Sequence, residues 1–335
     1  MDSIGAPETT GRAPVISTGS LPDPAVVAQL LTEAHERYRG VETGHVADYI
    51  PALAKASTDW FGLSVVGVKG AEHSVGDSGV EFSIQSISKP FVFALACEAL
   101  GQDVVRRRVG VNNTGLPFNS VMAIELNPDR TMNPMVNAGA IATTSLVPGA
   151  TADEKWQFIH DGLSRFAGHR LELDDEVYAS EAQTNDHNRG IAILLRGYDR
   201  MYWDPVEITD VYTRQCSLRV SVRDLAAMGA TLANGGVNPV TRERVIGAQV
   251  CKRVLAVLAT TGLYEQSGEW LYEIGLPAKS GVSGGIVTVS PGKGGLATFS
   301  PPLDAAGNSV RGQLATEFLS EMLGLNIFAS RAEAS

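Results

Sequence analysis

Two stretches that predict β-hairpins lie near opposite ends of this 335-residue chain, and helical patterns fill the middle. Near the start, the apolar run FGLSVVGV (61–68) is typical of a buried strand, and Lys69-Gly70 turns the chain toward a second strand. Near the end, GGIVTVS (284–290) and GLATFSP (295–301) flank a turn made of Pro291, Gly292, Lys293 and Gly294. Because hairpins pair strands antiparallel, the chain predicts an antiparallel sheet built from both of its ends.

Helix signals frame and fill this sheet. Asp23 and Pro24 begin a helix that Gly40 ends, and Asn308 is expected to cap a C-terminal helix over 309–323. A mostly apolar helix is predicted from Ser86 to Leu100, and a capping box at Ser221 begins another. We expect the two terminal helices to cover one face of the sheet and the 86–100 helix the other. The predicted fold class is α/β (α+β), a central antiparallel sheet flanked by helices with an inserted, mainly helical subdomain.

The chain shows no internal repeat, no long linker and no clean domain boundary. Residues 1–22 are rich in Gly, Pro, Ser and Thr and are predicted to be a flexible arm. A single domain is predicted over 23–328, with a sheet subdomain (about 23–85 and 265–328) and a helical subdomain (about 86–264). Residues 329–335 are assigned to a C-terminal tail.

Composition excludes several classes of function. The net charge of −10 disfavours nucleic-acid binding, and Arg106-Arg107-Arg108 is interpreted as a solvated helix end. No apolar run reaches the ~18 residues of a membrane span, and the first residues lack the pattern of a secretory signal. Three distant cysteines, Cys97, Cys216 and Cys251, are expected to be buried thiols in a reducing, cytoplasmic setting.

Patterns that bind metals or cofactors are missing. The six histidines form no H-E-x-x-H motif and no Cys/His cluster, so no metal is predicted. SPGKGG lacks the spacing of a phosphate-binding loop, and neither G-x-G-x-x-G nor G-x-S-x-G occurs. We therefore predict no cofactor.

A Ser-x-x-Lys motif occurs twice. Ser290 and Lys293 span the hairpin turn, so we interpret that pair as structural. Ser86 and Lys89 stand at the start of the buried helix, where one turn places both on one face. Burial lowers a lysine's pKa, and a neutral lysine can take a proton from a serine. On this motif alone, Ser86 as a helix cap with Lys89 pointing to solvent is an equal alternative.

A second motif favours chemistry at Ser86. In LPAKSGVSGG (276–285), Lys279, Ser280 and Gly281 open a strand whose small residues let a substrate approach. A backbone N–H near Val282 can serve as an oxyanion donor. This combination is the pairing found in serine acyl-transfer enzymes of the β-lactamase-like fold. The alternative is a Gly-rich strand with a surface lysine.

Longer motifs make the resemblance specific. The chain resembles the bacterial-type serine-dependent glutaminase family, which has a β-lactamase/transpeptidase-like fold. The similarity runs in order from about residue 24 to 328 and rests on the following motifs: FSIQSISK (82–89), PFNS (117–120), NPMVNAGAI (133–141), YTRQCSL (212–218), GLYEQSGEW (262–270), GLPAKSGVSGGI (275–286) and SPPLDAAGNSVRG (300–312).

This resemblance implies hydrolysis of L-glutamine to L-glutamate and ammonia, with Ser86 as nucleophile and Lys89 as proton acceptor. It also implies a substrate-binding set: Ser86, Asn137, Glu181, Asn188, Tyr212, Tyr264 and Val282. Tyr212 is further expected to relay a proton, and Lys279 joins the catalytic group. Judged singly, these side chains also suit ordinary roles, namely surface charge for Glu181, turns or caps for Asn137 and Asn188, and core packing for the tyrosines.

The family resemblance further suggests a homo-oligomer, a dimer or a tetramer. Two departures from the family pattern concern the site. Pro90 is expected to distort the first helical turn at Lys89, and the loop VGVNNTGLPFNS (109–120) is unusual. Two alternatives therefore stay open: another serine acyl-transferase or hydrolase of this fold, and a binding protein without catalysis.

Overall fold

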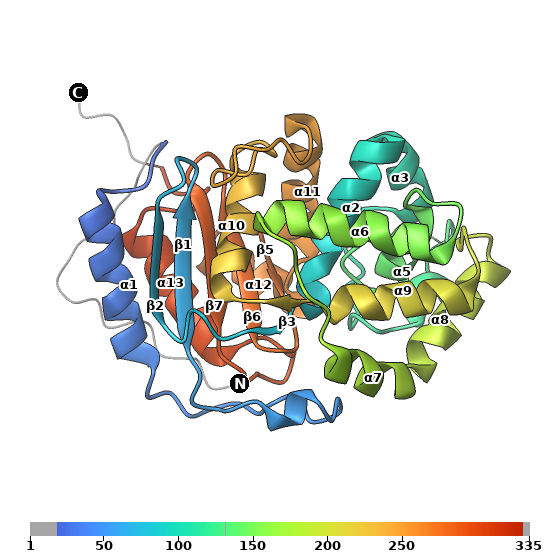
Figure 1. Cartoon of the computed structure of the whole chain (residues 1–335), viewed down its shortest axis with the longest axis horizontal. Helices are drawn as coiled ribbons and strands as arrows, with labels where there is room; N and C mark the ends of the chain where they lie inside the picture. Colours follow the sequence, from blue (N-terminus) through green and yellow to red (C-terminus); the bar gives the residue numbers. More distant parts are fainter. Residues whose placement is uncertain (1–18, 131, 331–335) are drawn as a thin grey trace.

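A five-stranded antiparallel sheet forms one half of the molecule, with strand order β2-β1-β7-β6-β5 (Figure 1). The computed structural model describes residues 19–130 and 132–330. The strands are β1 (Gly62–Gly67), β2 (Glu72–Gly76), β5 (Ala278–Ser280), β6 (Gly285–Ser290) and β7 (Gly294–Phe299). β1 pairs with β7, with Val65 opposite Leu296, so the sheet joins the two ends of the chain. The predicted antiparallel sheet is confirmed.

Different helices cover the two faces of this sheet. α1 (Pro24–Tyr38) and α13 (Val310–Met322) cover one face, as predicted, and bury Leu31 and Leu319 against Leu63 and Leu296. The other face is covered by α10 (Val222–Ala233), which lies in front of the strands in Figure 1.

The expectation that the 86–100 helix covers this second face is wrong. α10 can approach the strands closely because its facing residues are small. A Cβ on Gly229 would stand 3.0 Å from a methyl carbon of Val287, and one on Gly295 would stand 2.3 Å from the Ala226 carbonyl oxygen. The sequence pattern showed α10 as a helix but did not show which layer it joins.

The second half of the molecule is helical and surrounds α2 (Ser88–Leu100), which is buried from Ser88 to Cys97. An apolar helix of this kind is stable only when neighbours enclose it. The other α-helices within the described residues are α3 (Gln102–Val109), α4 (Met122–Glu125), α5 (Asn137–Leu146), α6 (Ala152–Ala167), α7 (Asp175–Gln183), α8 (Asp186–Gly197), α9 (Pro205–Cys216), α11 (Ala248–Thr261) and α12 (Ser267–Glu273).

Short elements complete the fold. A two-stranded ribbon of β3 (Phe82–Ser83) and β4 (Arg219–Val220) lies between the sheet and the helical half (Figure 1). Three 3-10 turns occur in the described chain: η1 (Leu53–Lys55), η2 (Gln85–Ile87) and η3 (Tyr264–Gln266).

Local sequence signals place most helix ends correctly. Asp23 caps α1, Ser221 and Asp224 form the predicted capping box of α10, and the Arg106-Arg107-Arg108 run occupies the last turn of α3. One cap is corrected, because Ser309 rather than Asn308 caps α13. The Asn308 amide instead donates to Gln266, at 2.8 Å.

Parts of the predicted arm and tail (residues 1–18 and 331–335) lie outside the described residues. Within 19–130 and 132–330, no helix combines the length and apolarity that crossing a bilayer requires. All three cysteines are free and buried, as predicted.

Candidate active site

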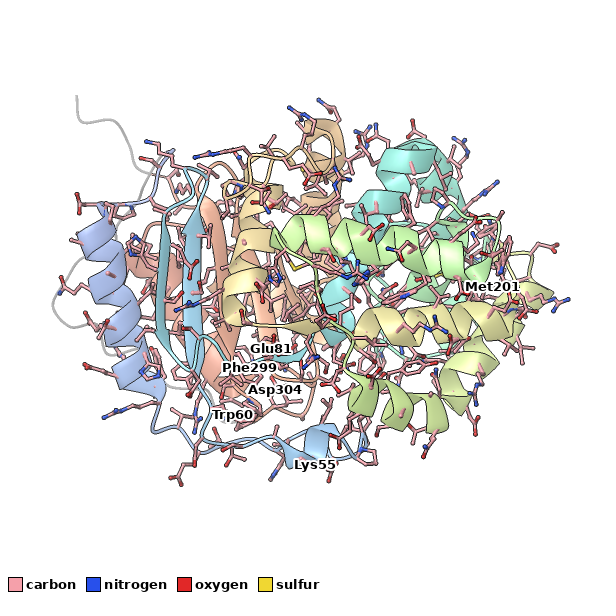
Figure 2. All side chains as sticks on the ribbon, viewed as in Figure 1. Lys55, Trp60, Glu81, Met201, Phe299 and Asp304 are labelled. Carbon is pink, nitrogen blue, oxygen red and sulfur yellow. The ribbon has the colours of Figure 1, made fainter. Side chains whose placement is uncertain are left out.

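A cavity of about 870 Å³ lies where the helical half meets the sheet half. Its outer wall comes from residues 43–50, which follow α1, and from residues 303–310, which precede and begin α13. Asp304 of this second segment is labelled in Figure 2. Four predicted site residues line the cavity, namely Asn137, Glu181, Asn188 and Val282. The size suits a small-molecule ligand.

Ser86 and Lys89 are not among the residues that line this cavity, but Lys89 contacts the lining residue Asn137. Ser86 belongs to the 3-10 turn η2 and is 8% exposed, and Lys89 belongs to the first turn of α2 and is 1% exposed. The Lys89 ammonium donates to Asn137 Oδ1 at 2.7 Å and to the Met135 carbonyl at 3.4 Å. Burial lowers the pKa of Lys89 to about 8. The alternative in which Lys89 points to solvent is therefore excluded.

The start of this helix differs from the predicted one. The α-helix begins at Ser88, and Ser86 stands in the 3-10 turn that precedes it. The expected distortion at Lys89 is absent, since Lys89 is itself in α2. Pro90 is the third helical residue, where a backbone N–H has no partner within the helix in any case.

Tyr264 and Lys279 pack beside Ser86. The Tyr264 hydroxyl donates to the Ser280 carbonyl at 3.2 Å and is hydrogen-bonded with the Ser86 side chain. The Lys279 ammonium lies 4.1 Å from the centre of the Tyr264 ring and donates to the same carbonyl at 2.9 Å. Burial, with a smaller contribution from Lys89, holds the pKa of Lys279 well below its usual range. Lys279 is thus buried in the site and is not a surface lysine.

Tyr212 comes from α9 and is buried next to the other predicted residues. Its hydroxyl stands 3.5 Å from Asn137 Oδ1, and it also hydrogen-bonds with the Cys216 thiol. Burial raises the pKa of Tyr212 well above its usual range and that of Tyr264 to about 12. Both phenols are therefore neutral near pH 7 and can act as hydrogen-bond donors.

Two of the polar side chains that line the cavity, Asn137 and Asn188, are connected to the buried lysine by hydrogen bonds. Asn137 accepts from Lys89 and donates through Nδ2 to Asn188 Oδ1, at 3.0 Å. Glu181 accepts a hydrogen bond of 2.5 Å from the Gln85 side chain, and burial raises the pKa of Glu181 to about 7. Asn188, Asn137 and Lys89 thus form a hydrogen-bonded series from the cavity inward, whereas Glu181 is joined to Gln85.

Close backbone packing brings the end of β5 to the serine turn. A Cβ on Gly281 would stand 3.1 Å from the Ile84 carbonyl oxygen and 3.3 Å from the Gln85 Cβ, so a side chain here would crowd the serine turn. Val282 follows and lines the cavity. Within the described chain, the backbone N–H groups of Ser86 and Val282 donate to no protein acceptor.

Several residues at the site were missed by the sequence analysis. Gln85 adjoins Ser86, and its φ of 51° is in the left-handed region that non-glycine residues rarely adopt. Asn185 lines the cavity and donates to Thr213, at 2.6 Å. Phe118 of the unusual loop packs 4.7 Å from the Tyr264 ring centre, and Tyr49 reaches the cavity from the outer wall. Gln85 belongs to the family motif FSIQSISK (82–89), but no local pattern indicated Tyr49.

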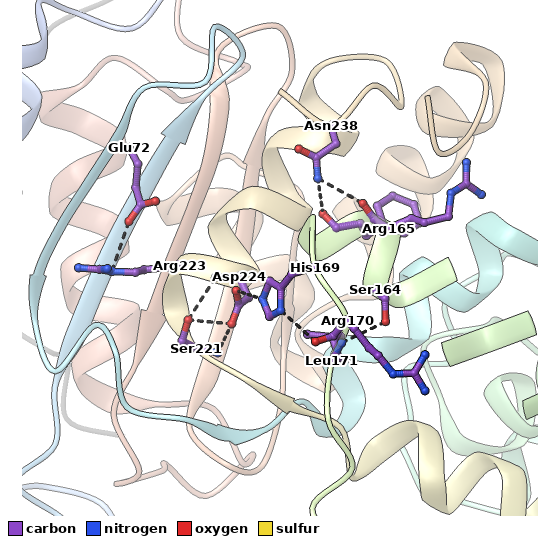
Figure 3. Close-up of polar contacts among 11 residues, drawn as sticks. Glu72, Ser164, Arg165, His169, Arg170, Leu171, Ser221, Arg223, Asp224 and Asn238 are labelled. Atoms are coloured by element: carbon purple, nitrogen blue, oxygen red, sulfur yellow. Dashed lines mark hydrogen bonds and ion pairs between the residues drawn. The ribbon is translucent and has the colours of Figure 1, made fainter. Parts of the chain in front are cut away.

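A second polar cluster has the residue types of a catalytic triad but a different arrangement (Figure 3). The Ser221 hydroxyl and the His169 ring both contact Asp224, at 2.8 Å and 2.7 Å. Because the histidine does not stand between serine and aspartate, it cannot take the serine proton. Within the described part of the chain, no three His, Cys, Asp or Glu side chains gather as metal ligands would.

The fold and site together define a mixed α/β protein whose polar cleft lies between an antiparallel sheet and a helical body. The glutaminase family model matches residues 44–328. Glutaminase 2 of Yersinia pestis is 61% identical over 315 residues, which are 94% of this chain and 93% of that protein. The glutaminase of Colwellia psychrerythraea is 50% identical over 92% of this chain and 99% of its own.

Solved structures agree with this relationship. The probable glutaminase ybaS superposes with a TM-score of 0.91 at 45% identity, covering 92% of this chain and 100% of that one. The glutamate form of Mglu superposes with a TM-score of 0.84 at 41% identity, covering 93% of this chain and 71% of that one. The chain belongs to the glutaminase family. This confirms the resemblance, the β-lactamase-like fold class and the enzyme class, a hydrolase.

Proposed function

We propose that this protein hydrolyses L-glutamine to L-glutamate and ammonia through an acyl-enzyme on Ser86, with Lys89 as the base. The observation that supports this most is the buried Lys89, one helical turn beyond Ser86, whose ammonium reaches the cavity wall through Asn137. Glutamine as substrate is supported by the relatives named glutaminases and by the glutamate form of one structural neighbour.

The cavity wall suits an amino acid substrate. Its ammonium needs a carboxylate, which Glu181 supplies when ionised, above a pKa of about 7. The substrate carboxylate then accepts from the amide of Asn188, and we place the side-chain amide toward Ser86. The neutral amide tail needs hydrogen bonds rather than charge, and the buried amide and phenol groups can provide these.

During acylation, one proton moves from the Ser86 hydroxyl to the amide nitrogen that leaves. Neutral Lys89 takes the Ser86 hydroxyl proton, and Oγ bonds to the side-chain amide carbon of glutamine. The resulting oxyanion accepts from the backbone N–H groups of Ser86 and Val282. The proton passes to the amide nitrogen, directly or through Tyr212, and the C–N bond breaks to release ammonia. Water cleaves the ester, frees glutamate and restores Ser86.

Lys279 and Tyr264 support the serine in this scheme. The Lys279 side chain packs against the face of the Tyr264 ring, and the phenol hydrogen-bonds with the Ser86 hydroxyl. The homo-oligomeric state stays a prediction from the resemblance, and the cytoplasmic location stays a prediction from the cysteines and the pattern of the first residues.

The test is ammonia release by the purified protein from L-glutamine, with L-asparagine as the control substrate and Ser86→Ala in parallel. We expect release from glutamine by the wild type and a loss of about 10⁴-fold or more in the variant. Both proteins should give the same melting curve. Wild-type rates in Ser86→Ala would disprove the nucleophile, and no release from either amide would favour a binding protein or another acyl substrate.

A further inference from the structure

A chain of buried hydroxyl and amide groups runs behind the serine turn. The Ser88 hydroxyl donates to the Gln85 carbonyl at 2.8 Å, and the Gln215 amide donates to the Ser88 hydroxyl at 3.1 Å. The Thr144 hydroxyl lies 3.1 Å from Gln215 Oε1 and 3.0 Å from the Ala140 carbonyl oxygen, and its one proton can be donated to either. All three of the side chains Ser88, Gln215 and Thr144 are 0% exposed. They have no part in the proposed reaction steps.

This series of hydrogen bonds joins the three helices that carry the reacting and binding groups. Ser88 adjoins Lys89 on α2, Gln215 follows Tyr212 by one turn on α9, and Thr144 follows Asn137 by two turns on α5. Residues three or seven apart share a helix face, so a shift of one helix along another would break these bonds. Buried polar networks of this kind specify one packing register because a broken bond leaves an unsatisfied group.

This series of hydrogen bonds ends at Gln85, one of two non-glycine residues of the site with a left-handed backbone; the other is Tyr264, with a φ of 57°. Gln85 has a φ of 51°, directly before Ser86, and such a conformation persists only when its surroundings hold it. Its carbonyl is held by Ser88, and its side chain by Ser83 at 3.1 Å and by Glu181. The Ser88 backbone N–H donates to the same carbonyl, so the Ser88 hydroxyl is a second donor to it, and the Gln215 amide orients that hydroxyl.

We infer that Gln215, acting through Ser88, is a positioning residue that holds the Gln85–Ser86 turn and keeps α2, α5 and α9 in register for acylation. This inference rests on the proposed function of Ser86. The groups it positions meet the substrate in the transition state, so their displacement slows turnover more than it weakens binding. Displacements of about 1 Å can lower a rate by about 10²-fold.

The variants Gln215→Met and Ser88→Ala remove one link each, and Thr209→Val is the matched control. Thr209 is also buried on α9, but its hydroxyl donates only within its own helix, to Pro205 at 2.7 Å. We expect both link variants to lower kcat for ammonia release by about 10- to 100-fold, with KM within about threefold of wild type. Thr209→Val should stay within about twofold of the wild-type kcat.

A double-mutant cycle separates the network from general loss of packing. If Gln215 acts through Ser88, the double variant loses no more activity than the worse single variant. Additive losses, unchanged kcat in both single variants, or an equal loss in Thr209→Val would overturn the inference. Melting curves identify any variant that fails to fold.

A crystal structure of Gln215→Met tests the geometry whether or not the wild type hydrolyses glutamine. We expect Gln85 to have left the left-handed region, and an unchanged turn would overturn the inference. An inactive wild type with a relaxed turn in the variant would count against the proposed function alone.

Discussion

Two buried ionisable side chains, Lys89 and Glu181, determine how the site responds to pH. Burial lowers the pKa of Lys89 to about 8 and raises that of Glu181 to about 7, so both shifts favour the uncharged form. The proposed roles need a neutral lysine and an ionised carboxylate. Raising the pH therefore moves both groups toward their active states.

We predict that kcat/KM for glutamine rises with pH through an apparent pKa between about 7 and 8, because the two buried groups deprotonate in that range. Initial rates of ammonia release from about pH 6 to about pH 9 measure this. A profile that is flat or falls over this interval would contradict the assignment of Lys89 as base.

Glu181→Gln should lower the activity of the protein and raise its stability. The folded-state pKa of about 7 exceeds the usual 4.5, so ionising Glu181 destabilises the folded protein progressively between these values and fully above the upper one. The cost above that point is on the order of 3 kcal/mol. We expect a higher melting temperature for the variant at about pH 8.5 and little change at about pH 4. An equal shift at both pH values would show that ionisation is not the cause.

At the scale of elements, α2 begins at a point where Pro90 does not disrupt its hydrogen bonds. Pro90 occupies the first turn, so its missing N–H breaks no bond of the α-helix. The other Ser-x-x-Lys pair also has the structural role that was predicted. Ser290 donates to the Leu325 carbonyl and Lys293 to that of Gly324, which ties the β6–β7 hairpin to the end of α13.

Pro90→Ala should therefore change both kcat and stability only slightly. We expect kcat within about threefold of wild type and a stability loss of about 1 kcal/mol, from the greater freedom of the unfolded chain. Denaturant titration and steady-state rates measure the two quantities. A tenfold or larger loss of kcat would mean that the proline itself sets the position of Lys89.

At the scale of the whole molecule, the cavity depends on a segment that crosses from the sheet half to the helical half. Residues 41–58 run along the lower edge in Figure 1 to α7, where the Ala52 N–H donates to Ser180. Arg311 of α13 holds both ends of this segment, donating to the Val41 carbonyl at 2.7 Å and to the Thr58 carbonyl at 2.8 Å. The Lys55 and Glu176 side chains form an ion pair farther along.

Replacing Arg311 should loosen the outer wall of the cavity without disturbing the serine. For Arg311→Met we predict a higher KM, a kcat within about threefold of wild type, and faster proteolysis between residues 41 and 58. Glu321→Gln, an exposed change on the same helix, is the control. Unchanged KM and protection from protease would show that the wall does not depend on Arg311.

Local patterns in the sequence determined many of the elements of this protein and the Ser86–Lys89 and Lys279 motifs of its site. Hairpin turns, the Asp23 and Ser221 caps, and the apolar helix after Ser86 depend on neighbours within a few residues, so they can be predicted from the chain alone. The family motifs added Asn137, Glu181 and the tyrosines, which no spacing rule would have selected.

Only the tertiary structure decided how these pieces meet. The choice of α10 as the helix on the sheet, the left-handed Gln85, the buried network at Gln215 and the outer wall at Tyr49 all depend on contacts between residues far apart in the chain. Such contacts select one arrangement through close packing and the satisfaction of buried polar groups. Neither close packing nor the pairing of buried polar groups can be predicted from a residue and its neighbours in the sequence alone.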